Sequence, residues 1–148
     1  MNKCDFQYDQ ESFSESFKRQ AESYDAALRK LWAVFDNWPA FAEKVLGGKA
    51  ELSLGALGDR VSGHVLGKRF QIDFAAVSSE GLGLVEAVIS VSSIKDASPV
   101  EVARFFSSPE GDIISVANEI LMTSDDSSQS NALLIAVVTK VMQASPSL

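Results

Sequence analysis

The chain has few residues that carry metal or nucleophile chemistry, with one cysteine and one histidine among 148 residues. The single cysteine, Cys4, forms no disulfide within the chain, which favours a reducing compartment, and we predict a cytoplasmic protein. A catalytic triad or a zinc site would have to use His64. His64 stands between Gly63 and Val65 in a strand-like segment and offset from its apolar side. We therefore predict no catalytic set and no metal site.

Long apolar runs and basic clusters are also scarce. The best apolar run, Ala132 to Val138, is far shorter than the 18 or more residues of a membrane span. Basic residues number 13 against 20 acidic ones, which gives a formal net charge of −7, and basic residues cluster at most in pairs such as Lys68-Arg69. Proteins that bind phosphate backbones usually carry a basic stripe. We predict neither a membrane span nor direct binding of nucleic acid.

Motifs for cofactor binding or acyl transfer are incomplete. Gly81-Leu82-Gly83 has half of a dinucleotide fingerprint but does not open a helix within a strand–helix–strand unit. Gly67-Lys68 lacks the following serine or threonine of a phosphate-binding loop. The segment 92–95 has the S-x-x-K spacing of penicillin-recognising enzymes without their other motifs. We interpret the glycines as turn residues and predict no cofactor.

The composition is otherwise that of one globular domain spanning residues 1–148, with 46% hydrophobic and 22% charged residues. The first ten residues are polar and predict a flexible tail. Apolar residues then recur at three- and four-residue spacing from Ser12 to Asp36, which predicts a helix with one apolar face. They are Phe13, Phe17, Ala21, Tyr24, Leu28, Leu31, Trp32 and Phe35. Ser12 and Glu15 have the spacing of a capping box.

A second, short helix is predicted from Pro39 to Leu46. The residue before a proline avoids the helical region, so Asn37-Trp38-Pro39 interrupts the first helix, while proline itself suits the start of the next. Gly47-Gly48 ends the second helix because glycine adopts the left-handed conformation without strain.

The hydrophobic period changes to two in the middle of the chain. Alternation over 51–54, 61–66 and 70–75 predicts strands with one face toward a core. A fourth strand, 83–93, is apolar on both faces and is predicted to be central. Short glycine-bearing links, including 55–59, favour antiparallel hairpins over parallel crossovers.

A further hairpin is predicted from Val100 to Ala117, with its turn at Ser108 to Gly111. The stretch after Val116 also fits a helical face, so a helix there remains an alternative. The last helix is predicted from Gln129 to Ala144. Its main apolar face consists of Leu133, Leu134, Val137, Val138 and Val141. The fold class is α+β, with two N-terminal helices, an antiparallel sheet of about five strands, and the C-terminal helix packed on one face.

Two groups of apolar side chains are candidates for an interaction surface, because aromatic clusters and large apolar patches mark interfaces. The first group lies around the break between the N-terminal helices, and the second is a surplus apolar face of the last helix. They are Trp32, Phe35, Trp38 and Phe41 in the first group, and Ile135 and Met142 in the second.

The leading hypothesis is a non-enzymatic protein-binding module with a basic protein partner or a second copy as its ligand. It follows from the lack of a catalytic set, the acidic charge and the surplus apolar helix face. In size, charge and helix–sheet–helix order the chain is similar to small acidic bacterial secretion chaperones and immunity proteins. That similarity, which is limited to those features, implies a chaperone-, immunity- or adaptor-like role.

Two alternatives remain open. The first is a small-molecule-binding or enzymatic domain with a pocket between sheet and helices, in which His64, Asp73 and Arg104 would be the polar groups. The second is mimicry of nucleic-acid charge by the acidic segments 5–15 and 110–126.

Overall fold

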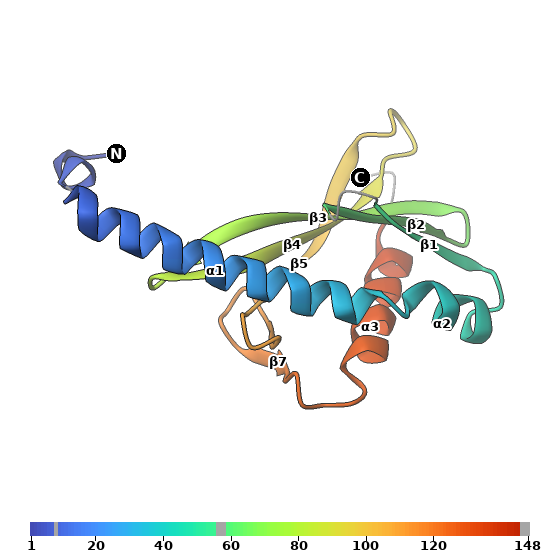
Figure 1. Ribbon diagram of the computed structural model, residues 1–148. Helices are drawn as coiled ribbons and strands as arrows, with labels where there is room; N and C mark the ends of the chain where they lie inside the picture. The colour runs from blue at the N-terminus through green and yellow to red at the C-terminus, as the bar shows by residue number, and fades with distance from the viewer. Residues whose placement is uncertain (8, 56–58, 146–148) are drawn as a thin grey trace.

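The computed structural model describes residues 1–7, 9–55 and 59–145 of the chain. It has the predicted α+β class, with two helices before an antiparallel sheet and one helix after it (Figure 1). The sheet has seven strands rather than about five, and their order in space is the order of the chain, β1 to β7. Each strand therefore pairs with its neighbours in sequence, as the short links predict.

The bounds of the elements are close to the predicted ones. A 3₁₀ turn spans Lys3–Phe6, and the helices are α1 (Gln10–Phe35), α2 (Trp38–Val45) and α3 (Gln129–Gln143). The strands are β1 (Ala50–Leu54), β2 (Arg60–Val65), β3 (Lys68–Ser79), β4 (Leu82–Ser92), β5 (Pro99–Ser107), β6 (Ile113–Ile114) and β7 (Ile120–Met122). The predicted link at 55–59 includes 56–58, which lie outside the described residues.

Helix α1 begins two residues earlier than its pattern predicts, because its N-cap is Asp9. The Asp9 carboxylate accepts from the Glu11 N–H at 3.3 Å and from the Ser12 hydroxyl at 2.8 Å. Ser12 thus lies inside the first turn, so the predicted capping box with Glu15 is wrong. The end of α2 is as predicted, since Gly47 has φ +60°, in the left-handed region that glycine tolerates.

At the end of the sheet, the structure decides between the strand and the helix that the sequence left open for the stretch after Val116. The residues after Val116 form β7, in which Ile120 pairs with Ile114 of β6. A turn closes this hairpin, with the Ser115 N–H donating to the Glu119 carbonyl at 2.8 Å and Asn118 at φ +64°. The helical alternative for this stretch is wrong, because the backbone groups bond across a hairpin instead.

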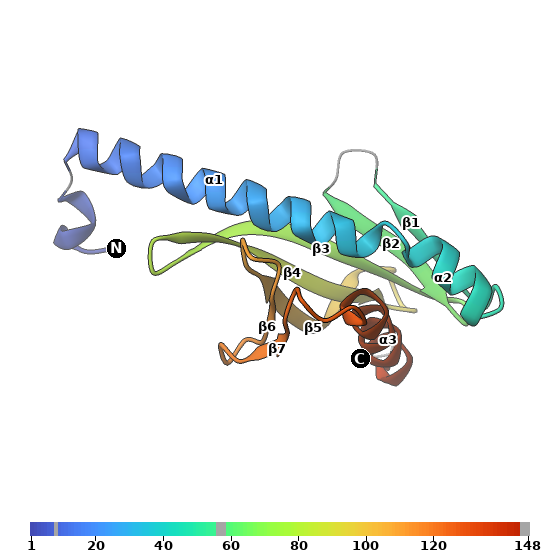
Figure 2. The ribbon, with the colours of Figure 1, turned by 60° about the horizontal axis from the view of Figure 1, so that its bottom comes forward.

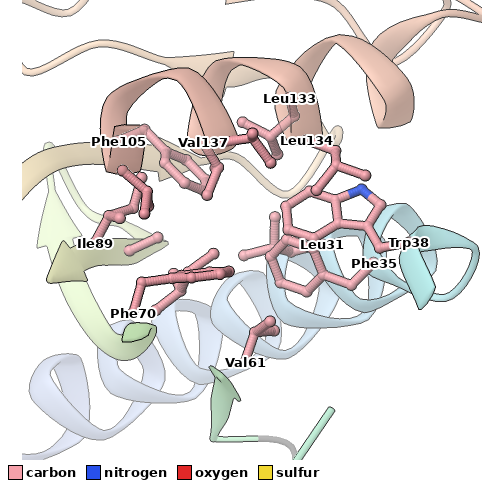
Figure 3. Close-up of a cluster of buried hydrophobic side chains, with 14 of the residues drawn as sticks. Leu31, Phe35, Trp38, Val61, Phe70, Ile89, Phe105, Leu133, Leu134 and Val137 are labelled. Atoms are coloured by element: carbon pink, nitrogen blue, oxygen red, sulfur yellow. The ribbon is translucent and has the colours of Figure 1, made fainter. Parts of the chain in front are cut away.

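The sheet has an inner face that packs against all three helices. Residues that pair across antiparallel strands share a face, so the register places Phe70, Ile72 and Phe74 on the same side as their β4 partners Val91, Ile89 and Ala87. These side chains form one core with the apolar faces of the helices (Figure 3). The predicted main face of α3, which includes Leu134 and Val137, is buried there.

Helix α1 crosses β4 at Gly83 and continues past the sheet. A Cβ on Gly83 would come within 2.1 Å of the Gln20 carbonyl oxygen, so only glycine allows the backbones to approach this closely. The N-terminal turns of α1 project beyond the β3–β4 hairpin (Figures 1 and 2). No strand of the described chain lies beneath the first turns of the helix.

Candidate functional site

The aromatic residues predicted to form an interaction surface lie mainly in the core. Phe35 and Trp38 are fully buried, with ring centroids 4.5 Å apart, and the Trp38 indole N–H donates to the Ser130 carbonyl at 3.0 Å. Trp32 and Phe41 are half-buried against the same cluster. The cluster joins α1, α2 and α3, so Phe35 and Trp38 present no surface to a partner in this fold.

The two candidates on α3 lie on the surface. Ile135 is 54% exposed and Met142 is 53% exposed. They are on the side of the helix away from its buried face. They are seven residues apart, about two turns, and exposed Thr139 stands between them.

The three polar candidates lie on the outer face of the sheet, opposite to the helices. His64 Nε2 is 3.2 Å from Glu51, Asp73 accepts from Arg60 Nε at 2.6 Å, and Arg104 donates to Glu101 at 2.7 and 2.8 Å. The structure therefore does not gather them into a pocket between sheet and helices, where the core side chains lie.

The outer face is defined by the side chains that alternate with the core along β1 to β7. The described helices pack on the inner face, so this side is open to solvent or to a partner (Figure 1). Its part over β1, β2 and the start of β3 is polar. Its part over the β3–β4 hairpin, the end of β5 at Phe106, and β6 is mainly apolar.

The apolar part contains a groove of about 370 Å³. Four half-buried apolar side chains line it: Val77, Leu84, Phe106 and Ile114. The register explains their proximity, because Val77 pairs with Leu84 and Phe106 pairs with Ile114. Exposed Val116 also lines the groove, as do Ser78, Ser79, Ser115 and Asn118, which supply polar groups.

The charged residues in the chain segments around this apolar groove are all acidic. No lysine, arginine or histidine occurs in residues 70–94 or 105–139, which contain the strand segments that line it. The carboxylates next to the groove are Glu80, after Ser79, Glu86, which pairs with Phe106, and Glu119, after Asn118. An apolar floor with acidic surroundings suits a ligand that is itself apolar and basic.

Arg104 is the basic residue at the polar end of this region, and its charge is neutralised. It lies between two carboxylates, with Nη1 3.2 Å from Glu86 and Nη2 2.7 Å from Glu101. The hydrogen bond from Arg104 lowers the pKa of Glu101, and that same bond to Glu101 raises the pKa of Arg104. One cation held by two anions leaves this corner of the sheet with a net negative charge.

Other site types find no support in the described part of the chain. Among residues 1–7, 9–55 and 59–145, no group of three or more potential ligands is placed to hold a metal ion. No helix in the same residues is long and apolar enough to cross a membrane. Comparison of the chain with protein-family models, curated proteins and solved structures finds no match.

Sequence reasoning missed the groove residues. The signal is present in β4, where Leu84 and Val88 alternate with core residues instead of the polar side chains expected on an open face. The sequence pattern there predicts a strand buried on both sides. In the structure it is indeed the central strand, but its second face is only half-buried.

Proposed function

We propose that this protein is a non-enzymatic binding module that holds a basic, partly apolar segment of another protein in the apolar groove. The observation that carries the proposal is an open sheet face with an apolar groove and no basic residue in the strand segments that line it, within 70–94 and 105–122. Apolar surface supplies the binding free energy, while the surrounding carboxylates select a partner of opposite charge and speed its encounter.

A chaperone-, immunity- or adaptor-like role in the cytoplasm would fit such a module. All three roles need a small, stable scaffold that presents one surface to a protein, and none needs a catalytic group. The buried core and its ladder of hairpins supply the scaffold. The groove supplies the surface.

The test is a pull-down from a lysate of the encoding organism with three versions of the protein. They are the wild type, Leu84→Thr/Ile114→Thr in the groove, and Ser53→Thr as a control on the polar part of the outer face. Threonine keeps β-strand propensity while removing apolar surface. We expect a stoichiometric partner, rich in lysine and arginine, that the wild type and the control retain and the groove variant loses.

Salt and charge supply the second part of this test. Binding should be weaker at high ionic strength than at low, because dissolved ions screen the attraction between the carboxylates and a basic partner. Glu119→Lys should weaken binding at low salt, because it replaces one of these carboxylates with a positive charge. A partner retained equally by the groove variant would show that binding uses another surface. Failure to recover any partner at either ionic strength would also count against the proposal.

A further inference from the structure

The sheet has a hollow, the turn notch, at the end where β3 begins and β4 ends. The β2–β3 turn at Leu66-Gly67 borders it on one side, and the β4–β5 turn around Ile94 borders it on the other. The start of β3 and the end of β4 lie between the two turns. The notch has a volume of about 470 Å³, within the range of small-molecule sites. It is separate from the apolar groove, which lies toward the other end of these two strands.

Arg69 supplies an unpaired positive charge to the turn notch. It is exposed on the outer face, and its side chain has no hydrogen bond or ion pair with any residue of the described chain. The other arginines on this face are neutralised, Arg60 by Asp73 and Arg104 by two carboxylates. Because a guanidinium binds carboxylate and phosphate groups through N–H donors in a fixed fork, Arg69 can hold an anion.

A hydroxyl lies beside this guanidinium. The antiparallel register that pairs Phe70 with Val91, continued by one residue, places Arg69 next to half-buried Ser92 on the same face. The Ser92 hydroxyl has no hydrogen-bond partner among the described residues. It can therefore donate to the same anion that Arg69 binds.

The neighbouring lysines limit the size of the anionic group. The Lys68 ammonium has three N–H donors, and the carbonyls of Val141, Met142 and Ala144 accept from it. Lys68 thus contributes charge to the notch but has no donor left for a ligand. The donors available for direct contact are one guanidinium and one hydroxyl, which match the two oxygens of a single carboxylate.

Apolar side chains border the notch on both sides. Leu66 is 67% exposed and Ile94 is 73% exposed. Leu66 and Gly67 have φ +51° and +79°, as in a two-residue turn whose first position usually holds asparagine, aspartate or glycine. A leucine there is strained, and its exposed side chain adds little to the core. Contact with an apolar ligand would explain why leucine occupies this position.

We propose that the turn notch binds a monocarboxylate with an apolar chain, such as a medium-chain fatty acid. The carboxylate lies against Arg69 and Ser92, and the chain lies between Leu66 and Ile94. For octanoate we expect a dissociation constant on the order of 0.1 to 1 millimolar, because the ligand is small and the notch is open. Each further methylene that becomes buried should tighten binding about two- to fourfold.

The first test is titration of the isotope-labelled protein with octanoate, followed by NMR. We expect the amide signals of residues 66–69 and 92–97 to shift, and those of Leu84 and Ile114 in the apolar groove to stay unchanged. Hexanoate should bind more weakly and decanoate more tightly. Acetate, which lacks the chain, and octanamide, which lacks the charge, should each bind at least fivefold more weakly than octanoate. The absence of shifts at residues 66–69 and 92–97 would overturn the proposal.

The second test removes the charge. Arg69→Gln should weaken octanoate binding about five- to tenfold, because it removes a charge-assisted hydrogen bond at a solvent-exposed position. Arg60→Gln is the matched control, since it removes the same charge from the same face at a side chain already bound to Asp73. It should bind octanoate as the wild type does. Equal weakening by both variants would show that general surface charge attracts the ligand, which contradicts the assignment to Arg69.

The third test removes the apolar contacts without damaging the fold. Leu66→Asn relieves the strain of the left-handed turn, so it should raise the melting temperature by about 2–4 °C while weakening decanoate binding threefold or more. Ile94→Ser should weaken binding to a similar extent. Leu82→Ser, at an exposed leucine where β4 begins, is the control and should not change binding. Unchanged binding in both Leu66→Asn and Ile94→Ser would overturn the proposal.

Two further ligands test the chemistry of the head group and its source. Octyl phosphate carries a larger, more highly charged head and should bind no more tightly than octanoate. A short peptide with a free C-terminal leucine carries an apolar carboxylate from a different source. A peptide that binds more tightly than decanoate, and loses binding when its C-terminus is amidated, would overturn the proposal in favour of a site for protein C-termini.

Discussion

Gly83 of β4 lies directly against the backbone of α1 at Gln20, so that a Cβ on Gly83 would come within 2.1 Å of the Gln20 carbonyl oxygen. The same Cβ would lie 2.9 Å from the Tyr24 nitrogen. This close approach marks the point where the helix leaves the sheet. It fixes which part of α1 is buried and which part projects.

Gly83→Ala should therefore lift α1 from β4 and destabilise the fold by about 2–3 kcal/mol, the usual cost of forcing an extra carbon into a packed site. Urea denaturation measures the effect. Gly81→Ala in the same hairpin is the control. A Cβ added to Gly81 would meet no other atom within 4 Å, and φ there is +79°. Its cost is therefore left-handed backbone strain of about 1 kcal/mol. Equal costs for both variants would contradict the close packing at Gly83.

Lys68, in the basic pair Lys68-Arg69, has a structural role at the end of α3. Its ammonium donates to the carbonyls of Val141 at 2.9 Å, Met142 at 3.0 Å and Ala144 at 2.6 Å. Carbonyls at the end of a helix lack partners within it, and a cation also suits the negative end of the helix dipole. Lys68→Met should cost about 1–2 kcal/mol of unfolding free energy, measured by urea denaturation. Arg69→Met, at the exposed neighbour, should cost almost no unfolding free energy. An equal loss of stability in both variants would show that the positive charge, and not the hydrogen bonds of Lys68, stabilises the fold.

Ser107 is buried on the inner face, and its hydroxyl has no hydrogen-bond partner among the described residues. A buried hydroxyl without a partner is destabilising, since it has lost its bonds to water. Ser107→Ala should therefore raise stability by about 1 kcal/mol and the melting temperature by about 2–4 °C. Exposed Ser53→Ala should leave both unchanged. A loss of stability in Ser107→Ala would mean that the hydroxyl is bonded.

Local patterns predicted those parts of the fold that local physics determines. Alternation fixed the faces of β3, because a one-residue slip would move Phe70 and Ile72 to solvent. Gly47-Gly48 predicted the end of α2, because few other residues tolerate left-handed backbone there. The buried face of α3 followed from its spacing in the same way.

The remaining features depend on contacts between distant segments. Phe13 and Phe17 have the same helical spacing as buried Leu31, and only the position of the β3–β4 hairpin leaves them exposed. The apolar groove likewise depends on the pairing of β4 with β5, in which Glu86 lies opposite Phe106, because this pairing brings the Val77–Leu84 pair of one hairpin beside the Phe106–Ile114 pair of the next. The local alternation shows neither this pairing nor where the β3–β4 hairpin ends beneath α1, so neither surface could be located before the fold was known.

The N-terminal end of α1 should be sensitive to acid, because it projects from the sheet and relies on its cap. The Ser12 hydroxyl, and then the Glu11 N–H, hold the pKa of Asp9 below its ordinary value of 3.8. A lowered pKa in the fold means that the cap contributes fully above pH 3.8. That contribution is lost as the pH falls through the lower folded value. NMR titration of the Asp9 carboxyl carbon should give a midpoint below 3.8, and Ser12→Ala should raise it.

Replacing Arg104 distinguishes two hypotheses for the outer face: a ligand site that uses Arg104, and an acidic groove that binds a basic protein segment. If Arg104 were a ligand-binding group, Arg104→Gln would abolish binding. If the acidic groove binds a basic segment, the same change frees Glu86 and Glu101 from their cation and increases the local negative charge. Binding of the partner should then become roughly two- to fivefold tighter at low salt and change little at high salt, where surface charges are screened.

Glu86→Gln should have the opposite effect on binding, because it removes the carboxylate of the residue that pairs with Phe106 at the groove. Titration of the purified partner at two ionic strengths would measure both, and weaker binding by Arg104→Gln would contradict the electrostatic role assigned to the groove.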